Sequence, residues 1–131
     1  MNNDLIKLVE NDRFATYVGI KLVKVEIGYA VTQMEISDNH LNGANIVQGG
    51  AIFTLADYAF AAASNSKGSL TLGVNANISY FKSPKGKLLT AEAREVSSGN
   101  KLCSYNVDVF DDNNDLIARF NATGYIKGEK R

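Results

Sequence analysis

An aspartate, Asp57, stands at the centre of an apolar stretch, with Leu55 and Phe60 among its neighbours. Burying a carboxylate among such side chains is costly, and the loss of water raises its pKa. A carboxylate of this kind can take a proton from water or attack an electrophilic carbon near neutral pH. The alternative is a structural role, in which Asp57 caps a loop or pairs with Arg94 or Arg119.

Two glycines, Gly49 and Gly50, precede the same stretch. If a helix begins there, its first backbone N–H groups are uncovered at the positive end of the helix dipole. A carbonyl oxygen that gains negative charge can dock on such groups, as it does in an oxyanion hole. A tight turn with close packing is the other explanation of the glycine pair.

The spacing of these two features limits how they can act together. Asp57 follows Gly49 by eight residues, which is roughly 12 Å along a helix that rises about 1.5 Å per residue. One reacting carbon therefore cannot touch both groups of a single helix. If both act on it, one must come from a second copy of the chain, which predicts a two-fold dimer with two composite sites.

The stretch that carries Asp57 is predicted to form one helix over residues 49–66. It is rich in alanine, the strongest helix former, and it contains no proline. Apolar residues occupy every face, and a helix of this kind must be surrounded by protein. Gly68 follows at the place where helices commonly end.

Strand patterns fill most of the remaining chain, after a short amphipathic helix predicted over residues 4–15. The pattern predicts an α+β fold in a single domain, residues 1–131, in which a curved antiparallel sheet of about six strands wraps around one long buried helix. The predicted strands cover residues 20–27, 29–37, 72–82, 88–97, 101–111 and 116–127.

Composition excludes several classes of protein. Lys plus Arg number 14 and Asp plus Glu number 14, so the formal net charge is zero, whereas a nucleic-acid binder carries a basic excess. No apolar run is long enough to span a membrane and no secretory signal is evident, so the chain is expected to be cytoplasmic. The single cysteine, Cys103, is expected to pack in the core. The single histidine, His40, lies in a turn-rich stretch that predicts a surface loop, and no metal site is expected.

The segment from His40 to Ala61 reads HLNGANIVQGGAIFTLADYAFA. It resembles the signature of hotdog-fold acyl-CoA thioesterases, in particular the phenylacetate-pathway (PaaI-like) branch, in which a loop L-N-x-x-x-x-x-H-G-G precedes a helix x-x-F-x-L-A-D-x-A-F-A. The resemblance implies a hotdog fold, homodimers with one continuous sheet, and often homotetramers. It also implies hydrolysis of an acyl- or aryl-acyl-CoA thioester to the free acid and CoA, without a metal or redox cofactor.

The resemblance also implies roles for individual residues. Asp57 matches the catalytic carboxylate, which activates water or attacks the thioester, and Gly49 matches the glycine whose N–H polarises the carbonyl, with Gly50 beside it. Asn42 matches the loop asparagine that helps to place substrate or water. Gln48 stands where the family usually carries histidine. Its amide can hydrogen-bond the thioester or orient the loop, but it cannot shuttle protons near pH 7.

Two further features concern the substrate. Lys82 lies near a turn with Lys85 and Lys87, where these lysines can meet CoA phosphates or stay solvated. Asn75 lies on a polar strand face that can line the acyl pocket, hydrogen-bond Asp57 or face solvent. The rival function is a non-catalytic acyl-CoA-binding hotdog protein, which the absence of the motif histidine makes plausible.

Overall fold

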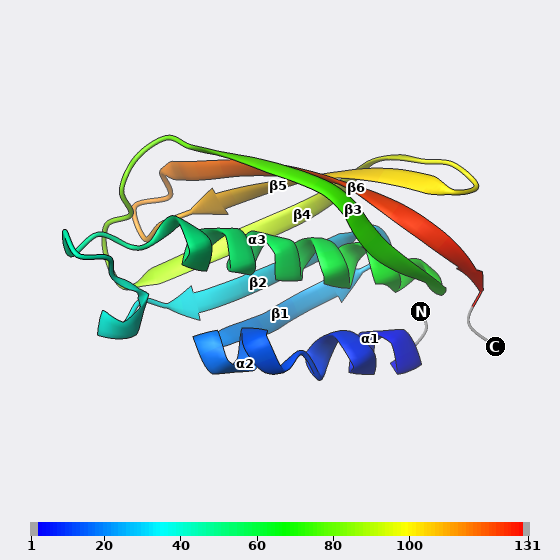
Figure 1. The fold of residues 1–131 in the computed structure, drawn as a ribbon, viewed down its shortest axis with the longest axis horizontal. Helices are drawn as coiled ribbons and strands as arrows, with labels where there is room; N and C mark the ends of the chain where they lie inside the picture. The colour runs from blue at the N-terminus through cyan, green and yellow to red at the C-terminus, as the bar shows by residue number, and fades with distance from the viewer. Residues whose placement is uncertain (1–2, 130–131) are drawn as a thin grey trace.

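The computed structural model describes residues 3–129 and shows one six-stranded sheet curved around a long helix (Figure 1). Neighbouring strands are antiparallel, in the order β1-β2-β4-β5-β6-β3. The predicted α+β arrangement is therefore confirmed. The elements are α1 (Asn3–Glu10), α2 (Arg13–Val18), β1 (Ile20–Glu26), β2 (Tyr29–Glu35), η1 (Asp38–His40), α3 (Gly49–Ser64), η2 (Asn65–Lys67), β3 (Ser69–Tyr80), β4 (Leu88–Ser98), β5 (Leu102–Phe110) and β6 (Leu116–Glu129).

The N-terminal segment forms two short helices, so the prediction of one helix over residues 4–15 is wrong. The chain breaks at Asp12, whose backbone is extended and whose side chain accepts a hydrogen bond from the Ala15 N–H at 3.0 Å. This is an N-cap, and it starts α2. Both helices pack against α3, and α2 also contacts β1, beside which the two helices lie in Figure 1.

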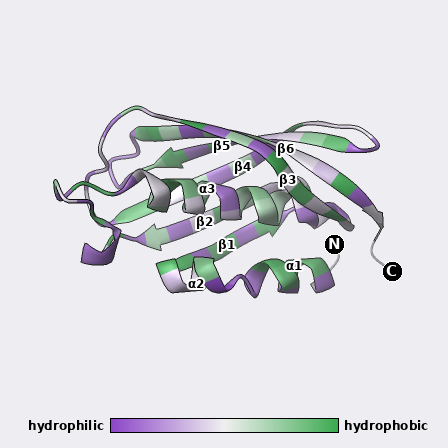
Figure 2. Cartoon of the chain, viewed as in Figure 1, coloured by the Kyte–Doolittle hydropathy of each residue, from purple (hydrophilic) through white to green (hydrophobic). Residues whose placement is uncertain are grey.

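The long helix α3 packs its small residues against the concave face of the sheet, mainly against β2, β4 and β5. Ala56, Ala59 and Ala63 are fully buried there, because their short side chains let the backbone approach the strands. Figure 2 shows a mostly hydrophobic helix interrupted by a hydrophilic band. The expectation that protein surrounds every face of α3 is wrong for the described chain, since Gly50 and Asp57 are exposed.

Strand β3 lies at one edge of the sheet and pairs only with β6 among the described strands. It begins at Ser69, earlier than the predicted strand 72–82. Most of it is exposed, including the apolar side chains of Leu72 and Val74, at 49% and 60%. An edge strand with exposed apolar side chains is a surface on which another chain readily pairs.

Two glycines allow β3 and β6 to approach α3 closely. A Cβ on Gly124 would lie 3.2 Å from the ring of Phe60 on α3, and closer still to Thr71 and Cys103 on the neighbouring strands. A Cβ on Gly73 would lie 3.3 Å from the ring of Phe60. Cys103 is buried in this layer, as predicted.

Residues 3–129 contain neither a helix suited to crossing a membrane nor a cluster of metal-binding side chains. No helix in this part of the chain combines the length and hydropathy that crossing a bilayer needs. Nor does this part bring three or more His, Cys, Asp or Glu side chains together in a cluster able to hold a metal ion.

Candidate active site

Asp57 lies in the middle of α3 on its exposed stripe, and it has no hydrogen bond or ion pair among the described residues. Packed protein around it nevertheless removes water, and this desolvation, together with the charge of Asp12, raises the pKa of Asp57. The proposed arginine partners are engaged elsewhere. Arg94 pairs with Glu92, and Arg119 pairs with Asp108.

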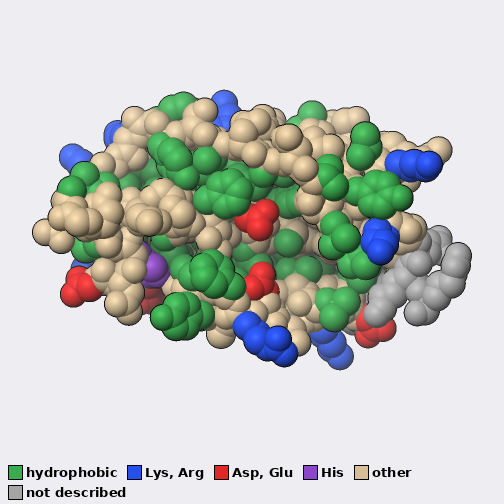
Figure 3. All heavy atoms as spheres, viewed as in Figure 1, with side chains coloured by type: hydrophobic (Ala, Val, Ile, Leu, Met, Phe, Trp, Pro, Cys, Tyr) green, Lys and Arg blue, Asp and Glu red, His purple; other side chains and the backbone are tan. Residues whose placement is uncertain are grey.

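Two hollows open beside Asp57. One, of about 320 Å³, lies between α3 and β3 and includes Asn75 in its wall. The other, of about 240 Å³, runs from Asp57 between α1, α3 and the start of β3. Figure 3 shows the same face of the molecule, on which acidic side chains stand among hydrophobic ones. The carboxylate of Asp57 is therefore open to a small molecule.

The start of α3 offers one uncovered backbone donor. Gln48 is the N-cap, and its side-chain Oε1 accepts a hydrogen bond from the Gly50 N–H at 2.9 Å. A Cβ on Gly50 would lie 2.5 Å from this oxygen, so the folded-back amide requires glycine there. The N–H of Gly49 has no acceptor within residues 3–129. Of the two glycines, Gly49 is thus the one able to donate to a ligand.

Tyr80 contacts the same helix start and was not identified from the sequence. Its hydroxyl donates to the carbonyl oxygen of Gly49 at 2.9 Å. A Cβ on Gly49 would lie 3.0 Å from the tyrosine ring, so the two residues are in close contact. The contact joins residues far apart in the chain, and no local sequence signal reveals it.

Asn42 holds the loop before α3 in shape. Its Oδ1 accepts hydrogen bonds from the N–H groups of Ala44 and Ile46, at 2.9 and 3.1 Å. Its side-chain NH₂ has no acceptor in the described part of the chain. Asn42 and Gln48 both line a third hollow, of about 570 Å³, which lies between α2 and the start of α3.

His40 is buried, so the prediction of a surface-loop histidine is wrong. It is 7% exposed, and its Nδ1 accepts a hydrogen bond from the Ser37 N–H at 3.0 Å. Its Nε2 then carries the proton and donates to the Val18 carbonyl at 2.6 Å. His40 therefore anchors the loop before α3 to the end of α2.

The ion pair of Lys82 is with Asp115 and not with a residue of the candidate site. Its ammonium group pairs with Asp115 at 2.9 Å, and both side chains are well exposed. An exposed pair of this kind contributes little to stability and exchanges readily. Lys82 remains able to meet a phosphate, but the structure gives it another partner.

Gly49 and Asp57 are placed on the same helix, as the sequence predicts, and the protomer does not bring them together. They are two turns apart, roughly 12 Å by the helix rise. The first offers an uncovered N–H and the second an unpaired carboxylate with a raised pKa. These are the two groups that hydrolysis of an acyl compound needs, namely a donor for the oxyanion and a base or nucleophile.

Comparisons with known proteins agree with this chemistry. Residues 39–118 match the sequence model of a family described as the thioesterase superfamily. A protein of Archaeoglobus fulgidus named as an esterase is 41% identical over 123 residues, which cover 93% of this chain and 80% of that protein. The acyl-coenzyme A thioesterase PaaI of Escherichia coli K12 is 30% identical over 122 residues, which cover 92% of this chain and 87% of that protein.

Solved structures resemble the chain over nearly its whole length. The structure of E. coli PaaI superposes with a TM-score of 0.89 at 29% identity, over 95% of this chain and 91% of that one. A protein of Streptococcus mutans UA159, solved bound to acetyl CoA, superposes with a TM-score of 0.81 at 27% identity, over 86% and 92% of the two chains.

Proposed function

The chain belongs to the thioesterase superfamily as a hotdog-fold, PaaI-like thioester hydrolase, and from this premise we propose that its substrate is an acyl-CoA, cleaved to a free acid and CoA. The S. mutans neighbour bound to acetyl CoA supports the choice of CoA as the thiol. The uncovered Gly49 N–H and the unpaired Asp57 carboxylate carry the proposal. Membership of a hydrolase family favours turnover over the non-catalytic binding that the sequence left open.

In the proposed reaction, the thioester carbonyl oxygen accepts a hydrogen bond from the Gly49 N–H, which stabilises the negative charge of the tetrahedral intermediate. Asp57 takes a proton from water while the water oxygen bonds to the acyl carbon. The carbon–sulfur bond then breaks, and the proton passes from Asp57 to the CoA thiolate. In the alternative route, Asp57 itself attacks and water hydrolyses the resulting anhydride.

The two routes differ in the fate of oxygen. In single turnover in ¹⁸O-labelled water, hydrolysis of an anhydride at the Asp57 carbon places label in the carboxylate of the enzyme. Direct attack by water labels only the free acid. Label in the peptide that contains Asp57, measured by mass spectrometry, therefore demonstrates the nucleophile route, whereas an unlabelled peptide is compatible with the base route and with hydrolysis of the anhydride at the acyl carbon.

The proposed active enzyme is a dimer or a tetramer built from such dimers. Within one protomer, Gly49 and Asp57 are too far apart to reach one carbon. The exposed edge of β3, with Leu72 and Val74, lies beside the stripe of α3 that carries Asp57. A second copy paired along this edge by a two-fold axis would set the helix start of each chain against the carboxylate of the other.

Supporting roles are proposed for the residues around these two groups. Gln48 and Asn42 present side-chain NH₂ groups beside the helix start, where they can donate to the thioester or to the amides of the CoA arm. Gly50 accommodates the folded-back Gln48 amide. Asn75 shares a hollow with Asp57 and is proposed to hold the attacking water. Lys82 is proposed to exchange Asp115 for a CoA phosphate.

The variant Asp57→Asn tests the proposed function. The substitution keeps the size of the side chain and removes its basicity, so hydrolysis of an acyl-CoA panel, followed by detection of the free thiol, should fall at least about a hundredfold. Circular dichroism and size-exclusion chromatography should match the wild type. Undiminished turnover in Asp57→Asn would remove this residue from the mechanism.

Subunit mixing tests the composite site. Asp57→Asn supplies an intact helix start, and Gly49→Pro supplies an intact carboxylate. A hybrid dimer has one complete site of two, and half of randomly exchanged dimers are hybrids, so about a quarter of the wild-type activity should return. Absence of recovery, with hybrid formation verified by native mass spectrometry, would contradict the composite site.

A further inference from the structure

The hollow of about 240 Å³ beside Asp57 has a mostly apolar lining. It begins at the carboxylate and runs along α3 towards α1 and the start of β3. Its apolar wall is formed by Leu5, Leu8, Val9, Phe60, Leu70 and Leu72. Two of these, Leu8 and Leu72, are 53% and 49% exposed in the single protomer, so apolar surface lies at the mouth of the hollow.

The polar residues deeper in this hollow are already engaged within the protein. The amide of Asn65 donates to the carbonyls of Ala61 and Thr71 and accepts from the Thr71 N–H. The Thr71 hydroxyl donates to the Ser69 carbonyl. A hydroxyl, amino or carboxylate substituent that entered this hollow would lose its water and gain no dedicated partner, which is costly.

The hollow at the start of α3 has a different character. It is larger, about 570 Å³, and Asn42 and Gln48 contribute side-chain NH₂ groups with no acceptor in the described chain. Its polar groups suit an arm that contains amides, such as that of CoA. The hollow of about 240 Å³ beside Asp57 suits an apolar group attached to the carbon that Asp57 reaches.

From this contrast we infer that the acyl group of the substrate is an unsubstituted aliphatic chain, held in the hollow between α1, α3 and β3. This inference rests on the proposed acyl-CoA hydrolysis. The hollow is smaller than the roughly 300–1,000 Å³ of sites for drug-sized ligands, and most of its apolar wall is aliphatic, with Phe60 the one aromatic ring among its described lining residues. A methylene chain fills such a space, whereas a hydroxylated ring requires a polar partner that the hollow does not provide.

Chain-length dependence tests the inference. The wild-type enzyme is assayed with acetyl-, butyryl-, hexanoyl- and octanoyl-CoA, and with phenylacetyl- and 4-hydroxyphenylacetyl-CoA. We expect kcat/KM to rise about fourfold for each added methylene until the hollow is full, and the best aliphatic substrate to exceed both aryl substrates. A flat profile, or preference for either aryl substrate, would overturn the inference. In either case cleavage of any of these thioesters leaves the proposed function standing, whereas cleavage of none contradicts the proposed function itself.

A pair of matched substitutions locates the acyl group. Ala61→Leu adds a side chain in the hollow beside Asp57, and Ala51→Leu adds the same side chain to the same helix in the hollow at the helix start. Ala61→Leu should lower the ratio of kcat/KM for octanoyl-CoA over butyryl-CoA about tenfold or more, and Ala51→Leu should leave this ratio unchanged. If only Ala51→Leu changes the ratio, the acyl chain lies at the helix start and the inference is wrong.

Discussion

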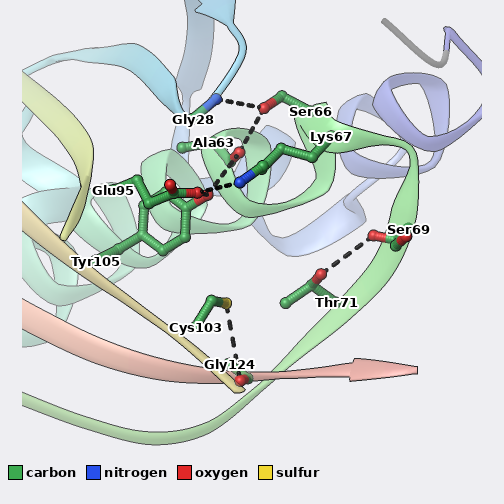
Figure 4. A network of polar contacts seen from close by, with 10 residues as sticks. All are labelled: Gly28, Ala63, Ser66, Lys67, Ser69, Thr71, Glu95, Cys103, Tyr105 and Gly124. Carbon is green, nitrogen blue, oxygen red and sulfur yellow. Dashed lines mark hydrogen bonds and ion pairs between the residues drawn. The ribbon is translucent and has the colours of Figure 1, made fainter. Parts of the chain in front are cut away.

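The polar groups along and around α3 differ in whether they are hydrogen-bonded within the protein. The Gly49 N–H at the start of the helix and the Asp57 carboxylate at its middle have no partner among the described residues. At the C-terminal end, shown in Figure 4, Ser66, Tyr105 and Glu95 are all hydrogen-bonded. The same helix therefore has one half whose polar groups are free to bind a ligand and one half whose polar groups hold the fold together.

The paired end is a network that crosses several elements. The Ser66 hydroxyl donates to the Ala63 carbonyl at 2.6 Å and accepts from the Gly28 N–H at 2.8 Å, which ties the β1–β2 hairpin to the helix end. Tyr105 donates to Glu95, which also pairs with Lys67 at 2.7 Å. Burial and the Glu95 charge raise the pKa of Tyr105 well above its ordinary value, so the hydroxyl stays a donor.

The difference in hydrogen bonding between the two regions of α3 indicates which residues are available for function. Burial of a polar side chain does not by itself mark a functional group here, since Ser66, which holds the fold together, is more deeply buried than Asp57. The state of the hydrogen bonds distinguishes the two regions, because the Gly49 N–H and the Asp57 carboxylate are available to a ligand, whereas the polar groups around Ser66 are already bound within the protein. Substitutions at one end should therefore change turnover and those at the other should change stability.

The largest expected effect comes from removing the uncovered N–H of Gly49. Gly49→Pro deletes this donor and also places the proline ring beside Tyr80. Proline is favoured at the first position of a helix, and the backbone of Gln48, at φ −68° and ψ 137°, already has the conformation preferred before proline. We expect kcat to fall about 100- to 1,000-fold, measured with saturating acyl-CoA and thiol detection.

Gly49→Ala is the matched control for this prediction. It introduces the same Cβ against the ring of Tyr80 but keeps the N–H. Its kcat should stay well above that of Gly49→Pro. Equal losses in the two variants would mean that the contact with Tyr80, rather than the missing donor, lowers the rate.

The next effect belongs to the paired end of the helix. Ser66→Ala removes both hydrogen bonds of the hydroxyl, to the Ala63 carbonyl and from the part-buried Gly28 N–H, and this should lower the free energy of unfolding by roughly 1–3 kcal/mol. Urea denaturation measures the loss, and kcat/KM at 25 °C should not change. Ser98→Ala, at an exposed serine, is the control and should stay within about 0.5 kcal/mol of the wild type.

A smaller effect on stability is expected at Asp57, and it has the opposite sign. Because the pKa of Asp57 is raised by burial in the folded state, the folded protein binds more protons than the unfolded one between the ordinary and the raised pKa. The stability of the wild type therefore falls as the pH rises through this window. Asp57→Asn should have a higher Tm than the wild type at pH 7, and calorimetry should show the gain disappearing below the ordinary pKa of aspartate.

The sequence predicted those parts of the molecule that depend on local pattern. Alanine content and strand periodicity are local, and they were sufficient for α3 and the antiparallel sheet. The identity of Asp57 and Gly49 as candidate groups was also local, because an acid in an apolar helix and glycines at a helix start are visible as residue types. The spacing of the two then indicated a second subunit.

Features that depend on distant contacts were not predicted. Buried His40 hydrogen-bonds the Val18 carbonyl, and the hydroxyl of Tyr80 reaches Gly49 from the far end of β3. The exposure of Asp57 was missed for a related reason. An apolar helix indicates complete burial, but the sequence of the helix alone does not say which of its faces stays exposed in the protomer.

The smallest predicted effect concerns Asp12, whose charge contributes to the raised pKa of Asp57. Asp12→Asn keeps the cap of α2, since asparagine is as good an N-cap as aspartate, and it removes the like charge. The pKa of Asp57 should therefore fall, although desolvation still holds it above the ordinary value. The acidic limb of kcat/KM against pH should move to lower pH, while kcat at its plateau should not change. Glu35→Gln removes one negative charge elsewhere on the surface, so an equal shift in that variant would assign the effect to net charge rather than to the proximity of Asp12.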